Sequence, residues 1–327
     1  MVINLSILYK FGKYLIPDTG YLIRTHYISI LLILLMNIFY GTGVAMVTPF
    51  QADGQVDYEG LKNLIEHLID GGVQYLVSLG TTGESATLNA GERKQVWSFT
   101  AQVVNKRVPL VAGIGGNNTH EVVEQVKEFN TDGYDAILSS SPHYNKPTQE
   151  GIYQHYKAIA QAAPLPVILY NVPSRTGSTI AAETTVRLAR DFKNIIGIKE
   201  ASGNFDLFNH LMRDKPEEFL VISGDDPVTL PMMALGAVGV ISVIGNALPK
   251  PLSAMVQLLL KNDYKQAQKI HSSLIEFTRL MFVEGNPAGA KNALKHLDVC
   301  GETLRLPLVP VSSGMAEAIK NETQKLA

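Results

Sequence analysis

The residue with the clearest chemical potential is Lys199, which follows the apolar residues Ile195–Ile198 in a strand-like segment. An ammonium group is costly to bury, and burial favours the neutral amine, which is the form that attacks a carbonyl carbon. A lysine in this position could therefore form a Schiff base with a carbonyl substrate. The alternative is a structural lysine that pairs with the adjacent Glu200.

Hydroxyl-bearing side chains end three other strand-like segments. Thr81 and Thr82 follow one segment, Tyr144 follows a second, and Tyr170 ends a third. Schiff-base formation needs protons to be delivered and removed, and hydroxyl groups in line can relay them. A single such tyrosine is usually a core residue with a bonded hydroxyl. Two tyrosines and a threonine pair beside one lysine favour a catalytic function.

Two features could bind an anionic substrate. The loop Gly80–Ser85 contains glycines that let backbone N–H groups face a carboxylate, and we expect a following helix N-terminus to add a favourable field. Arg175 follows a turn that contains proline and could clamp a carboxylate. Its alternative is an exposed surface arginine.

Two further motifs have a simpler structural interpretation. Gly113–Gly116 does not complete the pattern GxGxxG of a dinucleotide-binding loop, so a turn is expected. Asp225 and Asp226 could hold Mg²⁺, but we favour capping of the next helix.

These residues belong to strand-like segments that alternate with helical patterns. Near-continuous apolar runs are typical of strands buried on both faces of a parallel sheet. Eight successive β-α units predict a (β/α)8 TIM barrel, whose active site lies at the carboxyl ends of the strands, with a doubly wound open sheet as the main alternative. The eight segments begin at Val44, Val73, Val108, Tyr134, Pro166, Ile195, Phe219 and Val238.

The helical patterns and the domain boundaries follow from the same periodicity. Apolar residues recur at helical spacing after Asp57 and after Thr148, two residue types that cap helix N-termini. We expect residues 36–262 to form the catalytic barrel. Residues 263–327 have a helical pattern beyond the eighth unit and predict an appended C-terminal helical lobe, which could contact another subunit.

The N-terminal segment contains the apolar run Tyr27–Phe39, which is too short to span a membrane as a helix. Basic residues precede it, as in a signal peptide, but no small-x-small cleavage site follows. We therefore favour a domain that begins near Met36, with residues 1–35 as an upstream extension that is not native. A signal peptide or a membrane anchor is the alternative.

The composition of the 327-residue chain excludes several classes of protein. The 28 basic and 30 acidic residues give a net charge of −2, and no long basic run indicates a nucleic-acid surface. The single cysteine, Cys300, cannot form an internal disulfide or a cysteine-rich zinc site, and it indicates a reducing compartment such as the cytoplasm. The eight histidines lack close ligand spacing, so we expect no metal site.

From about Phe39 to the C-terminus, the sequence resembles the class I aldolases of the N-acetylneuraminate lyase and dihydrodipicolinate synthase superfamily, and within it the dihydrodipicolinate synthase branch. The second threonine of GTTGES and the arginine of NVPSRTG indicate that branch. The segments that carry the resemblance are GTTGESATL from Gly80, YNVPSRTG from Tyr170, IIGIKEASGN from Ile195 and SGDD from Ser223.

The resemblance implies a lyase that condenses pyruvate with aspartate-4-semialdehyde on the route to lysine, without a metal or an organic cofactor. Lys199 would form the imine with pyruvate, and Tyr170 would donate and accept protons. Thr81 would link Tyr170 to Tyr144, which would reach in from a neighbouring subunit. The family therefore implies a homo-oligomer, a homotetramer built as a dimer of dimers.

The resemblance also implies the contacts to the substrates. Thr82 and its backbone N–H would hold the pyruvate carboxylate, and Arg175 the carboxylate of aspartate-4-semialdehyde. Gly224 and Ile241 would line the pocket. Alternative functions are a related pyruvate aldolase that cleaves a sugar acid or 4-hydroxy-2-oxoglutarate, and a keto-acid sensor without catalysis.

Family members that lysine inhibits bind it between subunits, and the resemblance places this site at Ser85, Ala86, Asn117 and Glu121. Inhibited enzymes often have histidine at the Ala90 position, histidine or glutamate at Arg93, and tyrosine at His143. A cationic Arg93 would repel the ammonium group of lysine, so we expect weak or absent feedback inhibition. Whether His143 tunes the proton relay or only packs is left open.

Overall fold

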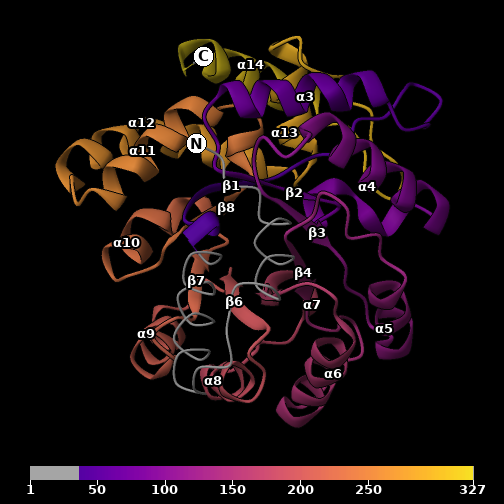
Figure 1. Ribbon diagram of the computed structural model, residues 1–327. Helices are drawn as coiled ribbons and strands as arrows, with labels where there is room; N and C mark the ends of the chain where they lie inside the picture. Colours follow the sequence, from indigo (N-terminus) through magenta and orange to yellow (C-terminus); the bar gives the residue numbers. More distant parts are fainter. Residues whose placement is uncertain (1–36, 327) are drawn as a thin grey trace, which may run out of the picture. The chain divides into compact units, whose positions relative to one another are not determined.

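The computed structural model describes residues 37–326, and its centre is a closed barrel of eight parallel strands (Figure 1). Each strand pairs with the next one along the chain, and β8 pairs with β1. This topology confirms the predicted (β/α)8 barrel and rules out the open sheet. The strands are β1 Gly41–Ala45, β2 Tyr75–Ser78, β3 Leu110–Gly113, β4 Ala136–Ser140, β5 Val167–Asn171, β6 Ile195–Glu200, β7 Leu220–Ser223 and β8 Gly239–Ser242.

Helices follow the strands in chain order and surround the barrel (Figure 1). They are α3 Tyr58–Asp70, α4 Ala90–Val104, α5 Thr119–Lys127, α6 Gln149–Ala162, α7 Pro173–Thr176, α8 Ala182–Asp191, α9 Phe205–Asp214, α10 Thr229–Ala234 and α11 Pro249–Leu260. Short 3₁₀ turns are η1 Asn37–Phe39, η2 Thr81–Gly83, η3 Ser85–Thr87, η4 Asp226–Val228 and η5 Ile244–Asn246.

Side-chain caps fix the starts of the two helices that the sequence predicted most clearly. The Asp57 carboxylate accepts a hydrogen bond from the N–H of Gly60 at the start of α3. The Thr148 hydroxyl accepts one from the N–H of Gly151 at the start of α6. Each bond satisfies one of the donors that a helix N-terminus leaves free, so both predicted starts are confirmed.

The first strand is shorter than predicted and begins earlier. β1 covers Gly41–Ala45, whereas the sequence indicated a strand from Val44 to Phe50. Beyond β1 the N–H of Val47 donates to the side chain of Asn246, at 3.1 Å, instead of to a neighbouring strand. Pro49 has no backbone N–H that could donate a hydrogen bond to a neighbouring strand. The segment therefore continues as a loop at the carboxyl end of the barrel.

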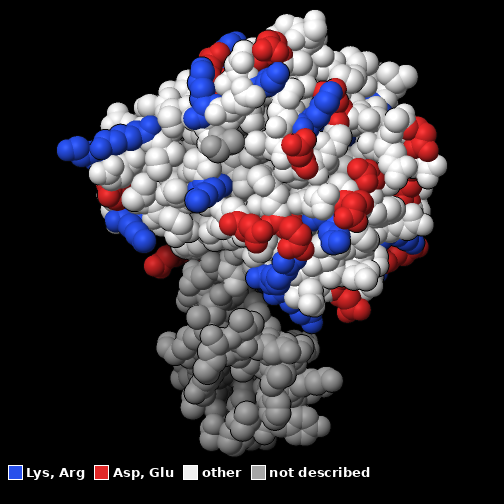
Figure 2. All heavy atoms as spheres, turned by 90° about the horizontal axis from the view of Figure 1, so that it is seen from above, with Lys and Arg blue, Asp and Glu red and all other residues white. Residues whose placement is uncertain are grey.

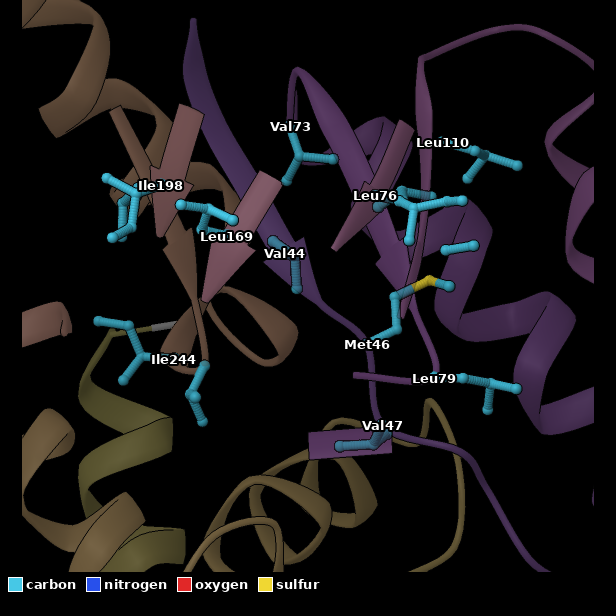
Figure 3. Close-up of a cluster of buried hydrophobic side chains, with 14 of the residues drawn as sticks. Val44, Met46, Val47, Val73, Leu76, Leu79, Leu110, Leu169, Ile198 and Ile244 are labelled. Carbon is cyan, nitrogen blue, oxygen red and sulfur yellow. The ribbon is translucent and has the colours of Figure 1, made fainter. Parts of the chain in front are cut away.

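Successive side chains of each strand point alternately toward the surrounding helices and toward the inside of the barrel. Figure 3 shows Leu169 of β5 and Ile198 of β6 in a buried aliphatic cluster that also contains Val44 and Leu76. Because Leu169 and Ile198 pack in the cluster shared with the helices, their chain neighbours face the inside of the barrel.

The C-terminal region is helical, as predicted, and comprises α12 Tyr264–Val283, α13 Ala288–His296 and α14 Ser313–Leu326. α12 packs against α11 and α14, and it buries Leu274, Phe277, Leu280 and Met281. Phe39–Ala327 forms one compact unit, and the domain boundary near residue 262 stays a prediction. The prediction for residues 1–35 and most of the apolar run before Phe39 lie outside the described residues.

Figure 2 shows basic and acidic residues interspersed on the face it presents, without a large field of one sign. That face offers no continuous basic track for a nucleic-acid backbone. Within residues 37–326, no helix is long and apolar enough to cross a membrane.

Candidate active site

Lys199 and Tyr170 meet at the carboxyl ends of β6 and β5. The two residues are register partners in the parallel pair, and the Lys199 Nζ lies 4.5 Å from the centroid of the Tyr170 ring. Both side chains are buried, and Lys199 is 4% exposed. The structure thus brings together the predicted nucleophile and one predicted proton donor inside the barrel.

Gly224, directly after β7, leaves the space that the Lys199 side chain occupies. A Cβ atom at position 224 would lie 2.9 Å from both Cγ and Cε of Lys199, and 2.8 Å from the Cβ of Ala201. These distances are shorter than van der Waals contact. Any side chain at this position would displace the lysine.

Glu200 does not pair with Lys199, so the structural-lysine alternative is wrong. Its carboxylate accepts hydrogen bonds from the Asn171 side chain at 2.8 Å and from the N–H of Ser202 at 2.6 Å. Burial raises the pKa of Glu200, although these hydrogen bonds oppose the shift. Within residues 37–326, Lys199 has no carboxylate within ion-pair distance.

The acidic pair after β7 does not cap the next helix, which corrects our prediction. Neither Asp225 nor Asp226 makes a side-chain cap bond at the start of η4 or α10. Instead the buried Asp226 carboxylate accepts the N–H groups of Val243 and Ile244, at 2.9 and 3.1 Å, and so fixes the chain after β8. Burial raises the pKa of Asp226. Among the described residues, no cluster of three potential ligands could hold a metal ion.

The Gly80–Ser85 loop also differs from the prediction, because no helix N-terminus follows it directly. The loop forms the 3₁₀ turns η2 and η3, and α4 begins only at Ala90. Between the turns, Glu84 adopts a left-handed backbone with φ of +50°. A right-handed helix cannot continue through that conformation, so the loop offers backbone turns without the field of a helix. The Gly113–Gly116 segment ends β3 and continues as an extended loop instead of the turn that we expected.

The C-terminal region supplies two contacts to this loop that the sequence did not reveal. The Asn286 Nδ2 donates a hydrogen bond of 2.9 Å to the Oγ1 of Thr82. The Lys291 Nζ lies 2.5 Å from a carboxylate oxygen of Glu84, and both side chains are fully buried. Both contacts join residues more than 200 positions apart, and no local pattern indicates such pairs.

Arg175 lies in α7 and lines a cavity of about 610 Å³ together with Thr81 and Asn286. Its guanidinium donates a 3.3 Å hydrogen bond to the backbone carbonyl of Asn286. The arginine is exposed, but its place in the cavity favours the predicted carboxylate clamp over a surface role. Ile241 is fully buried in β8.

Tyr144 is not folded into the site of its own chain. It follows β4 in a loop, its side chain is 88% exposed, and its backbone φ is +69°. A bulky residue with positive φ is uncommon and costs conformational energy. The structure therefore presents this tyrosine outward from a turn with a positive φ, away from the buried Lys199 and Tyr170.

The residues expected to bind lysine lie around the same cavity. Arg93 is held there, because its guanidinium donates a 2.6 Å hydrogen bond to the carbonyl of Leu88. Ala90 lines a second cavity, of about 640 Å³, which shares Arg93 with the first. The first cavity is lined by Ser85, Ala86, Arg93, Asn117, Glu121 and His143 in addition to the residues above.

Comparison with known proteins identifies relatives over almost all of the described chain. The sequence model of the dihydrodipicolinate synthetase family matches residues 38–326. The 4-hydroxy-tetrahydrodipicolinate synthase of Parabacteroides distasonis is 53% identical over 287 residues, which cover 88% of this chain and 97% of that protein. The enzyme of the same name from Flavobacterium psychrophilum is 51% identical over 292 residues, covering 89% of this chain and all of the relative.

Solved structures show the same similarity. The crystal structure of dihydrodipicolinate synthase from Aquifex aeolicus superimposes with a TM-score of 0.85 at 41% sequence identity. The match covers 88% of this chain and 98% of that one.

Proposed function

The chain belongs to the dihydrodipicolinate synthetase family, and we propose that Lys199 carries out the family's chemistry as the amine that binds pyruvate. The enzyme is a lyase of lysine and diaminopimelate biosynthesis that condenses pyruvate with L-aspartate-4-semialdehyde to 4-hydroxy-tetrahydrodipicolinate. The single observation that best supports the assignment of Lys199 is its burial against the Tyr170 ring inside the barrel.

The reaction proceeds through covalent intermediates on Lys199. The neutral amine attacks the ketone carbon of pyruvate, and loss of water from the carbinolamine leaves a protonated imine. The imine withdraws electrons, so a methyl proton is lost and an enamine forms. The enamine carbon attacks the aldehyde, and the amino group of the adduct then displaces Lys199 as the ring closes. The imine is the electron sink, so the mechanism requires neither a metal nor an organic cofactor.

Proton transfer is assigned to three hydroxyl groups. Tyr170 donates and accepts protons at the forming and breaking carbon–oxygen bonds, and Thr81 links it to Tyr144 of a neighbouring subunit. The outward position of Tyr144 supports this arrangement, since the side chain is 88% exposed in a single chain. A homotetramer, built as a dimer of dimers, is the assembly we propose.

The substrate carboxylates are assigned to Thr82 and Arg175. Thr82 binds the pyruvate carboxylate through its hydroxyl and its N–H, and Arg175 binds that of aspartate-4-semialdehyde. Arg175 lines the cavity beside Thr81, which supports its role. Gly224 and Ile241 line the pocket, and the contact distances at Gly224 support its place beside Lys199.

Borohydride trapping tests the assignment of Lys199. The reagent reduces an imine to a stable amine, so the wild-type chain should gain the mass of reduced pyruvate on the peptide that contains Lys199. The Lys199→Ala variant should show no adduct and no turnover. Tyr170→Phe should still be trapped but should lose most of its turnover, by about 100-fold or more. Trapping that persists in Lys199→Ala would move the chemistry to another lysine.

The shared name of the relatives favours this condensation over the alternatives considered from the sequence. A sensor would need no hydroxyl relay. Cleavage of a sugar acid or of 4-hydroxy-2-oxoglutarate should be much slower than the condensation when both are assayed on one preparation.

Feedback inhibition by lysine is proposed to be weak or absent. Arg93 lines the cavity that also contains Glu121 and Asn117, so its guanidinium would repel the ammonium group of an entering lysine. We expect half-inhibition in the millimolar range or above. Arg93→Glu should lower the concentration for half-inhibition, because it exchanges repulsion for attraction. Half-inhibition of the wild type well below 1 mM would contradict the proposal.

A cytoplasmic location is proposed as well. Its support is the single, unpaired Cys300, since secreted proteins often depend on disulfides. Fractionation of cells that express the full chain, or a chain that starts at Met36, would detect a membrane-bound form if the N-terminal segment anchors the protein.

A further inference from the structure

Asn286 reaches from the segment between α12 and α13 into the loop that follows β2. Its side-chain amide donates a 2.9 Å hydrogen bond to the Thr82 hydroxyl oxygen, 204 residues earlier in the chain. Both side chains are well buried, with Asn286 7% exposed and Thr82 3% exposed. Asn286 also lines the cavity that contains Thr81 and Arg175.

The direction of this hydrogen bond determines what the Thr82 hydroxyl can do. A hydroxyl group has one hydrogen to donate and two lone pairs that accept, whereas an amide NH₂ group only donates. One lone pair of the Thr82 oxygen is therefore occupied by Asn286, and the hydroxyl hydrogen must point elsewhere. Within residues 37–326, no protein acceptor is bonded to that hydrogen.

A carboxylate can only accept hydrogen bonds. We propose that Asn286 is a positioning residue that orients the Thr82 hydroxyl, so that its hydrogen is donated to the carboxylate of pyruvate. The inference rests on the proposed function, in which Thr82 binds that carboxylate. It gives the C-terminal helical region an indirect part in substrate binding, because Asn286 lies between α12 and α13 of that region.

The two groups of Asn286 serve different parts of the site, and this separates the proposal from a merely structural role. The side chain acts on Thr82, whereas the backbone carbonyl accepts the hydrogen bond from Arg175. A side-chain substitution leaves the carbonyl in place. Loss of the amide should therefore weaken the binding of pyruvate and leave the binding of aspartate-4-semialdehyde nearly unchanged.

Steady-state kinetics of Asn286→Ala and Asn286→Asp test the proposal. We expect Asn286→Ala to raise the KM for pyruvate about ten-fold, the value of one hydrogen bond to a charged group, and to change the KM for the aldehyde by less than about two-fold. Asn286→Asp has nearly the same shape but accepts the Thr82 hydrogen and adds a negative charge. It should raise the KM for pyruvate further. If the alanine variant does not fold, the aspartate variant alone tests the proposal.

Asn292 provides a matched control in the same lobe. It is buried, and its amide donates to the Glu302 side chain at 2.6 Å, outside the substrate site. Asn292→Ala should leave the KM for pyruvate unchanged. If it raises that KM as much as Asn286→Ala does, the effect is a general loosening of the lobe and the proposal is overturned.

A double-mutant cycle with Thr82→Val decides whether Asn286 acts through the hydroxyl. In the Thr82→Val background, Asn286→Ala should cost little further affinity for pyruvate, because there is no hydroxyl to orient. Additive effects, or an unchanged KM in both Asn286 variants, would overturn the inference. Borohydride trapping of the wild type distinguishes failure of the proposed function from failure of this inference. If the wild-type chain traps no pyruvate, the proposed function is wrong. If it traps pyruvate but the Asn286 variants do not behave as expected, only the role of Asn286 is wrong.

Discussion

At the scale of single residues, the position of Lys199 depends on the lack of a side chain at Gly224. Gly224 has no side chain, and a Cβ there would lie 2.9 Å from two carbons of the lysine. The lysine side chain would have to move by several tenths of an ångström, which would change its position relative to the Tyr170 ring. A catalytic group must be held close to its productive geometry.

Gly224→Ala should therefore reduce kcat by about 100-fold while the protein stays folded. Steady-state kinetics and a thermal melt check both parts of this statement. Gly314→Ala is the control, because no heavy atom lies within 4 Å of a Cβ built there and the residue is helical. Full activity in Gly224→Ala would mean that the lysine adapts and that the close packing is unimportant.

Sequence reasoning found Lys199 because a charge in an apolar strand is a local anomaly that needs no partner to be noticed. Asn286 and Lys291 gave no such signal. Each acts on a residue more than 200 positions away, and that proximity exists only after the barrel closes. The proline-containing turn before Arg175 indicated a candidate carboxylate clamp, but nothing in the sequence indicated the hydrogen bond from Arg175 to Asn286.

At the scale of elements, the buried ion pair between Glu84 and Lys291 joins α13 to the loop that contains Thr82. The loop has two 3₁₀ turns in place of a regular helix, so side-chain contacts must hold its conformation. Lys291 also lies 4.3 Å from the centroid of the Phe50 ring. Burial lowers the pKa of Lys291 against the opposing effect of Glu84.

Lys291→Met should destabilise the protein by about 3–5 kcal/mol, because it leaves the Glu84 carboxylate buried without its partner. Addition of Glu84→Gln should recover part of that loss, since the double variant buries no unpaired charge. Urea unfolding measures both effects. Lys94→Met removes an exposed ion pair with Glu128 and should change the free energy of unfolding by less than about 1 kcal/mol. Equal effects of the two lysine variants would contradict the argument.

The strands and the capped helices could be predicted because their signals are local. β-branched runs indicated all eight strands, and the Asp57 and Thr148 caps indicated two helix starts. The predictions failed where long-range contacts replace local ones. After β1, the side chain of Asn246 accepts the hydrogen bond from the N–H of Val47. The Asp226 carboxylate accepts a backbone N–H of the segment after β8 instead of one at the start of its own helix.

At the scale of the whole molecule, closure of the barrel brings β5, β6 and β7 together, so that Tyr170, Lys199 and Gly224 share one interior. A single chain does not complete the proposed relay. Tyr144 points outward. Its spacing from Tyr170 is compatible with a site in one chain or in two, so only the family resemblance, and no local pattern, indicated that it acts on another subunit.

Subunit complementation tests whether Tyr144 acts across an interface. Tyr144→Phe and Lys199→Ala should each be nearly inactive. In a mixed dimer, one site combines the intact Lys199 of one subunit with the intact Tyr144 of its partner, and the other site lacks both. Random reassociation of equal amounts makes about half of the dimers mixed and half of their sites complete. The mixture should thus recover about a quarter of the wild-type activity.

Without exchange of subunits the mixture should stay inactive, which is the control. If exchange is shown by mass but no activity returns, Tyr144 serves its own chain and the proposed relay between subunits is wrong.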